Sequence, residues 1–176
     1  MRLKQCFTGL LLLFVQLSFG QKERYLEVLR AVLDSEQGKG ATNLLIQCER
    51  PLTFFDMEAY QYEAEISLPL ETLYTLSIGA LKSKAGRWEF DSNTTKIGIT
   101  KNPCISAKQI QKLFRKTGKR QNILSVSTPV FDASNQYCVI QVAYAKFTKS
   151  SYGLSCLLLQ SPKGWEVIAE FDFWMS

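Results

Sequence analysis

The feature that most constrains the fold of this sequence is a change in its hydrophobic period near residue 120. Before that point, apolar side chains recur at the three- to four-residue spacing of a helix face. After it, apolar and polar residues alternate in runs separated by short polar turns, which is typical of strands. Helices followed by an antiparallel sheet are the simplest arrangement of these segments, and we predict a single α+β domain.

Four runs are predicted strands of an antiparallel meander: residues 124–131, 137–147, 154–160 and 165–175. In the last run, one set of alternating residues is apolar and the other is acidic. The apolar set comprises Trp165, Val167, Ala169, Phe171, Phe173 and Met175. We therefore expect one sheet face to be buried under the N-terminal helices and the other to face water.

Three helices are predicted before the strands. Residues 22–37 place their apolar side chains on one face, and Gly38 ends the segment. A second helix starts near Pro69 and ends near Lys82, with Leu70, Leu73, Tyr74, Ser77 and Leu81 at helical spacing. The third helix has a capping box, Ser106 with Gln109, before residues 107–117, and Gly118 as its stop. Residues 39–68 give no clear pattern.

Residues 1–20 have the organisation of a secretory signal peptide. Arg2 and Lys4 precede an apolar run, and Ser18 and Gly20 are the small residues expected before a cleavage site. We therefore expect a domain of residues 21–176, without a transmembrane anchor, exported to the periplasm, the cell surface or the extracellular space. The alternative is that the run is a membrane anchor, but it is short for that role.

The chain of 176 residues contains no histidine, and this excludes several kinds of active site. Imidazole serves as general base in most nucleophilic triads and as a common zinc ligand. No other recognisable catalytic motif, metal site or cofactor-binding motif is present. We interpret the domain as a non-catalytic binding or envelope-associated protein, and we expect no cofactor and no metal.

Four cysteines remain after removal of residues 1–20, in a compartment that permits disulfides. If the second hairpin turns near residues 150–151, Cys156 lies opposite residue 145, too far from Cys138 for a direct bridge. The strand from residue 124 is expected to run back along the third helix towards Cys104. We therefore predict a Cys104–Cys138 disulfide, with Cys48 and Cys156 paired or free; the alternative is that the cysteines are free buried thiols.

Charge is segregated along the chain. Residues 101–120 carry seven basic side chains and no acid, whereas residues 21–80 carry five bases and ten acids. Five of the basic residues fall on one face of the third helix: Lys108, Lys112, Arg115, Lys116 and Lys119. This face is a candidate site for an anionic partner, either an anionic surface or an acidic protein. The alternative is a solvated face that pairs loosely with the acidic N-terminal half. We expect no nucleic acid, because no aromatic residue interleaves the basic residues.

The acidic face of the last run provides a second candidate site. Glu170 and Asp172 are expected to lie on the same strand face, with Glu166 one further pair away. Paired carboxyl groups at such spacing act in glycosidases. The alternative function is therefore a cone-like pocket domain that binds or hydrolyses a small ligand with these carboxylates.

The second half of the chain resembles uncharacterised small exported proteins of Bacteroidota type. The resemblance rests on the runs CISAKQIQKLFRKTGKRQNILSVSTPVF, YCVIQVAYAKF and GWEVIAEFDFWMS, and it extends over residues 50–176. It implies a Gram-negative periplasm or cell surface, and it transfers no functional residue. More loosely, the helices and the final meander look like the cystatin-like cone of nuclear-transport-factor-2 proteins, many of which enclose a pocket.

Overall fold

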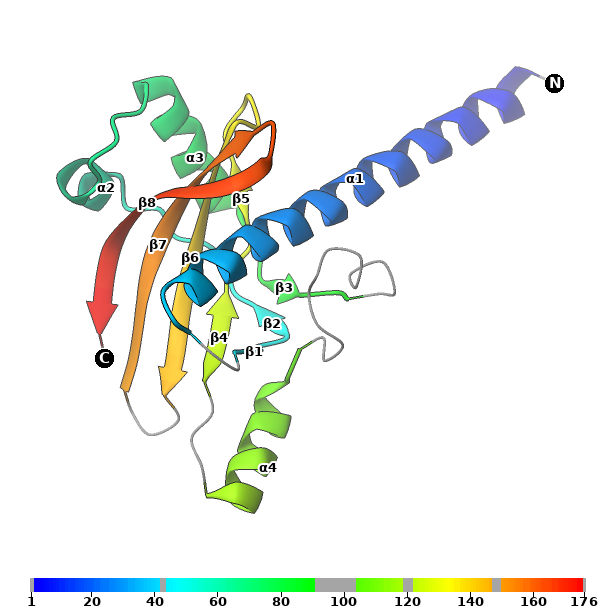
Figure 1. The fold of residues 1–176 in the computed structure, drawn as a ribbon. Helices are drawn as coiled ribbons and strands as arrows, with labels where there is room; N and C mark the ends of the chain where they lie inside the picture. Colours follow the sequence, from blue (N-terminus) through cyan, green and yellow to red (C-terminus); the bar gives the residue numbers. More distant parts are fainter. Residues whose placement is uncertain (1, 42–43, 91–103, 119–121, 147–149, 176) are drawn as a thin grey trace.

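The structure, a computed structural model, describes residues 2–41, 44–90, 104–118, 122–146 and 150–175 (Figure 1). Its helices are α1 (Arg2–Gly38), α2 (Met57–Glu63), α3 (Leu70–Lys82) and α4 (Ala107–Thr117). Its short N-terminal strands are β1 (Leu45–Ile46), β2 (Glu49–Arg50) and β3 (Gly86–Arg87). The later strands are β4 (Ile123–Val126), β5 (Val130–Phe131), β6 (Tyr137–Lys146), β7 (Ser150–Ser161) and β8 (Gly164–Met175).

The main sheet confirms the predicted α+β class. Its strand order is β1-β4-β6-β7-β8, and β5 also pairs with β6. All of these pairings are antiparallel except that of β1 with β4. Among the described residues, β1 and β8 form the two edges of the sheet, and no pairing joins them into a closed cone. A separate ribbon is formed by β2 and β3.

The first predicted strand, residues 124–131, is divided into β4 and β5 by a polar break. Ser127 and Thr128 are buried between the two strands, and Pro129 follows them. The Ser127 hydroxyl accepts a hydrogen bond from the Gln141 backbone N–H at 2.8 Å and shares a second one with the Thr53 hydroxyl at 2.7 Å. Proline has no backbone N–H to donate to a neighbouring strand, so the pairing with β6 is interrupted between β4 and β5.

Helices cover both faces of the sheet, so the prediction of one wet face was wrong. On one face, Leu26, Leu29 and Val32 of α1 pack over Ile140 and neighbouring side chains. On the other face, side chains of α2 and α3 pack over β6, β7 and β8 (Figure 1). The reason is that β6 and β7 are apolar on both of their faces, as in the run from Leu157 to Leu159, and strands of this kind need cover on each side.

Helix α1 is longer than the predicted 22–37 segment, and its N-terminal part extends away from the sheet (Figure 1). Within the part of the chain that the structure describes, no helix is both long and apolar enough to span a bilayer. The signal peptide stays a prediction, because nothing in the structure tests it.

Helix α3 begins and ends as predicted but buries a different face. Leu73, Leu76 and Ala80 are buried, whereas Leu70, Tyr74 and Leu81 are exposed. At Gly79 a Cβ atom would lie 2.7 Å from a methyl group of Val130, so the missing side chain lets α3 approach β5 closely. This contact with the sheet selects the face that α3 buries.

Strand β8 contains two bulges that change the direction of its side chains. The pairing with β7 shifts at Ile168 and again between Phe171 and Trp174, where Asp172 has a φ of +55°. Trp165 therefore packs with α1, whereas Phe171 packs with α2 and α3. The six apolar residues predicted to share one face do not do so, because each extra residue reverses the alternation.

Candidate functional site

The predicted basic face lies on α4, which stands apart from the two covered sheet faces. Figure 1 shows α4 beyond the end of the sheet at which β4 begins. Ile110 is buried, and Leu113 and Phe114 are half-buried, so the apolar face of α4 is turned towards the protein. Lys108, Lys112, Arg115 and Lys116 are exposed, while Lys119 lies outside the described residues. The charged face is therefore presented to solvent.

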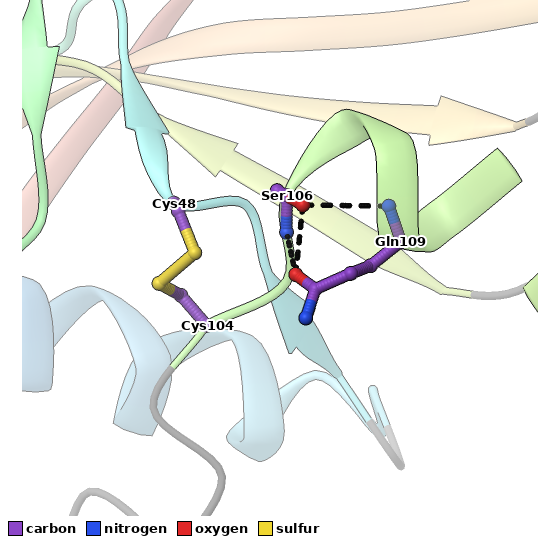
Figure 2. Close-up of a disulfide and its surroundings, with 4 residues drawn as sticks. All are labelled: Cys48, Cys104, Ser106 and Gln109. Atoms are coloured by element: carbon purple, nitrogen blue, oxygen red, sulfur yellow. Dashed lines mark hydrogen bonds between the residues drawn. A yellow bond between two sulfur atoms is a disulfide. The ribbon is translucent and has the colours of Figure 1, made fainter. Parts of the chain in front are cut away.

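Local signals set both ends of α4, as predicted. The Gln109 backbone N–H donates to the Ser106 hydroxyl at 3.3 Å, and the Ser106 backbone N–H donates to the Gln109 side chain at 2.8 Å (Figure 2). Gly118 ends the helix in the left-handed conformation, with a φ of +63°. These caps satisfy backbone groups that a helix of this length leaves unpaired at its ends.

A disulfide beside the start of α4 joins Cys104 to Cys48, and the prediction of a Cys104–Cys138 bridge was wrong (Figure 2). Chain pairing brings the two residues together: Gln47 forms a parallel bridge with Ile105, and the Cys48 N–H donates to the Ile105 carbonyl at 3.0 Å. The prediction failed because α4 does not lie along β4, so Cys104 is not returned to the end of the sheet that carries Cys138.

Cys138 and Cys156 are free and buried. The β6–β7 register places Cys156 opposite Ile140, not opposite residue 145, because β7 begins at Ser150. Burial raises the pKa of both thiols, that of Cys138 far above its ordinary value. Thiols of this kind stay protonated at neutral pH and are poor nucleophiles.

None of the four exposed basic side chains of α4 forms a salt bridge with a described carboxylate. Some acids of the N-terminal half have other partners. For example, the buried Glu36 contacts Lys39 at 2.7 Å, and Lys39 also contacts Glu170 on β8. Burial disfavours the charged Lys39, but its bonds to Glu170 and Glu36 outweigh this effect and raise its pKa. The described contacts do not support the alternative that the basic face pairs with the acidic half.

The three carboxylates of β8 are not brought together. Glu170 contacts Lys39, which directly follows α1. Asp172 accepts a hydrogen bond from the Ser155 hydroxyl at 3.2 Å on the opposite face of the sheet. Glu166 is exposed and accepts from Ser161 at 3.0 Å. The expectation of a shared face for Glu170 and Asp172 was wrong because the second bulge lies at Asp172. Glu170 and Asp172 therefore do not form a pair on one face of β8.

The surroundings of Asp172 shift the pKa of its carboxyl group, and a substitution can test this shift. Burial raises its pKa above the ordinary value of 3.8, the hydrogen bond from Ser155 opposes the rise, and the charges of Asp56 and Glu63 add to it. The folded state binds this proton more tightly than the unfolded state does. The free energy of unfolding therefore falls as the pH rises from 3.8, the ordinary pKa, through the raised pKa of the folded state. Asparagine is neutral, tolerates the positive φ and keeps an acceptor for Ser155.

We expect Asp172→Asn to raise the melting temperature at neutral pH by a few degrees at most, and to leave it unchanged below pH 3.8. Melting curves of both proteins across this pH range measure the difference. A wild-type protein that is more stable than the variant at neutral pH would show that the fold favours the ionised carboxylate.

A second group of functional interest surrounds Arg50, at a place where two hollows meet. The first hollow has a volume of about 540 Å³ and the second about 400 Å³. The guanidinium carbon of Arg50 lies 5.0 Å from the ring centre of Tyr25 and 5.3 Å from that of Trp88. Arginine stacked on aromatic rings in this way is held by cation–π contacts.

The pattern of the sequence does not reveal this group. Tyr25 is read as part of an apolar helix face, Arg50 as part of a break before Pro51, and Trp88 as part of a short extended piece. Tyr25 comes from α1, Arg50 from β2, and Trp88 follows β3. The β2–β3 pairing and the packing of α1 bring them together, and neither leaves a periodic signal in the sequence.

Comparison of the chain with protein families, with curated proteins and with solved structures gives no significant match.

Proposed function

We propose that this protein is a non-catalytic domain of the cell envelope that docks on an anionic surface, such as phospholipid headgroups, through the basic face of α4. The observation that carries the proposal is the exposure of Lys108, Lys112, Arg115 and Lys116 without a salt bridge to any described carboxylate. Charges left unpaired in this way are available to a partner.

The packing of α4 supports an electrostatic mode of docking. A helix that inserts into a membrane interface needs an apolar face free to enter the acyl region. In α4 that face is occupied, because Ile110 is buried and Leu113 and Phe114 are half-buried. Docking therefore depends on charge and weakens as salt rises.

Export to the periplasm or the cell surface is part of the same proposal. The Cys48–Cys104 disulfide supports it, because disulfides persist in oxidising compartments. The organisation of residues 1–20 supports it independently.

Substitution of both Lys112 and Arg115 by glutamine is expected to weaken binding to anionic vesicles by about 30-fold at low ionic strength, because each basic residue near such a surface contributes about 1 kcal/mol. Cosedimentation with phosphatidylglycerol vesicles, with phosphatidylcholine vesicles as the neutral reference, measures the effect. The wild-type protein is expected to bind only the anionic vesicles.

Lys163→Glu is the matched control, because it lowers the formal charge by two, as the double variant does. Lys163 is exposed on the turn between β7 and β8, at the other end of the sheet from α4 (Figure 1). Equal losses in the two variants would mean that net charge, and not the face of α4, governs binding.

A further inference from the structure

The Arg50 guanidinium is held in one position before any ligand is present. Tyr25 and Trp88 flank it, and its Nε–H donates to the Thr128 hydroxyl at 3.1 Å. The Thr128 hydroxyl in turn donates to the Lys84 carbonyl at 2.8 Å. A binding group that is already ordered loses little conformational entropy when it binds.

The terminal nitrogens of Arg50 keep their hydrogen-bonding capacity. Nη1 and Nη2 together carry four N–H donors. Among the described residues, none accepts a hydrogen bond from them, and no carboxylate lies within salt-bridge distance. Burial lowers the pKa of Arg50, against the opposing effects of Tyr25 and Glu89, but arginine stays protonated. A half-buried cation with unused donors is the complement of an anion.

The surroundings of Arg50 add positive charge. Arg87 lines the first hollow, and Lys82 and Lys84 line the second. The acids that line the two hollows, Glu89 and Asp132, already have partners. Glu89 in the first hollow pairs with Lys22 at 3.6 Å. Asp132 in the second accepts backbone hydrogen bonds from Ser134 and Tyr137.

We propose that the two hollows form a binding site for a small ligand with several carboxylate or phosphate groups, and that one such group lies against Nη1 and Nη2 of Arg50. The fork of N–H groups matches the two oxygens of either group. The first hollow, of about 540 Å³, has the size of a small-ligand site. The site is distinct from the basic face of α4, so it goes beyond the proposed docking function.

Isothermal titration calorimetry at low ionic strength tests the site with two probes, citrate for carboxylates and inorganic pyrophosphate for phosphates. We expect saturable binding of at least one probe to one site, and the tighter probe identifies the preferred group. Arg50→Gln is expected to weaken that binding at least ten-fold, and Arg50→Lys is expected to restore only part of it, because lysine lacks the fork. Absence of saturable binding of both probes to the wild-type protein would overturn the proposal.

Two variants separate a role for Arg50 from effects of net charge and of α4. Arg30→Gln removes one exposed positive charge of α1 outside the hollows, and Lys112→Gln with Arg115→Gln removes two from α4. Both are expected to bind the probes as the wild-type protein does. Unchanged binding in Arg50→Gln, or an equal loss in either control, would contradict the assignment.

Gly86→Ala gives a second measurement in case Arg50→Gln does not fold. A Cβ atom at residue 86 would lie 2.9 Å from Nη2 of Arg50, so the guanidinium must move while its charge is kept. We expect a several-fold loss of affinity with an unchanged circular dichroism spectrum. Affinity equal to that of the wild-type protein in a folded Gly86→Ala variant would exclude the proposed position of the anionic group.

Discussion

Replacement of Phe171 by alanine is expected to lower the free energy of unfolding by about 3–5 kcal/mol, the range typical of deleting a buried aromatic ring. The Phe171 side chain is fully buried on the sheet face that α2 and α3 cover. Its ring lies edge-on to Tyr60 at 5.1 Å and to Phe55 at 5.9 Å. The substitution removes these contacts and leaves a cavity under α2. Urea denaturation followed by circular dichroism measures the loss.

Phe173→Ala is the matched control for this experiment. A strict alternation along β8 puts residues 171 and 173 on the same face, but the Phe173 side chain is 62% exposed because a bulge intervenes. We expect its substitution to change stability by no more than about 0.5 kcal/mol. Equal losses in the two variants would mean that β8 keeps a regular alternation in solution.

Removal of the Cys48–Cys104 disulfide is the other change with a large expected effect. The bridge closes a loop between cysteines 56 residues apart. The bridge lowers the chain entropy of the unfolded state, and its removal restores that entropy. Cys48→Ser is therefore expected to lower the free energy of unfolding by about 4 kcal/mol. Denaturation of the wild-type protein with and without reductant is expected to show a similar difference.

The control is Cys138→Ala, which leaves the Cys48–Cys104 pair intact and is expected to cost about 1 kcal/mol. Mass spectrometry after alkylation of the denatured protein gives the connectivity directly. Two more cysteines are expected to be labelled after reduction than before it, in the wild-type protein and in Cys138→Ala alike. Loss of the disulfide in Cys138→Ala would show that Cys104 pairs with Cys138 in the wild-type protein.

The parts of the fold that were predicted correctly depend on neighbouring residues. Ser106, Gln109 and Gly118 mark the ends of α4, because capping is an interaction over three or four residues. The start of α3 after Pro69 and the order of the later strands follow from equally local signals. The exposed basic side chains of α4 belong to this group too, since the periodicity of one helix places them.

The predictions that failed required knowledge of which segments pair. The bulges in the β7–β8 pairing decide on which face of the sheet each side chain of β8 lies. Glu170 and Asp172 therefore lie on opposite faces and not, as predicted, on the same face. The cover on both sheet faces depends on where α1, α2 and α3 pack. Cys138 is free because Cys104 pairs with Cys48, and that pairing depends on the bridge between Gln47 and Ile105, segments far apart in the sequence.

The chain order of α3, α4 and the later strands, the class of the fold and the charged face of α4 follow from interactions between residues close in sequence. The disulfide partner of Cys104 and the group of Tyr25, Arg50 and Trp88 come from tertiary packing. The physical reason is that side-chain periodicity is set within one helix or strand. Contacts between segments depend on pairing register and on which of several apolar faces gains the better packing.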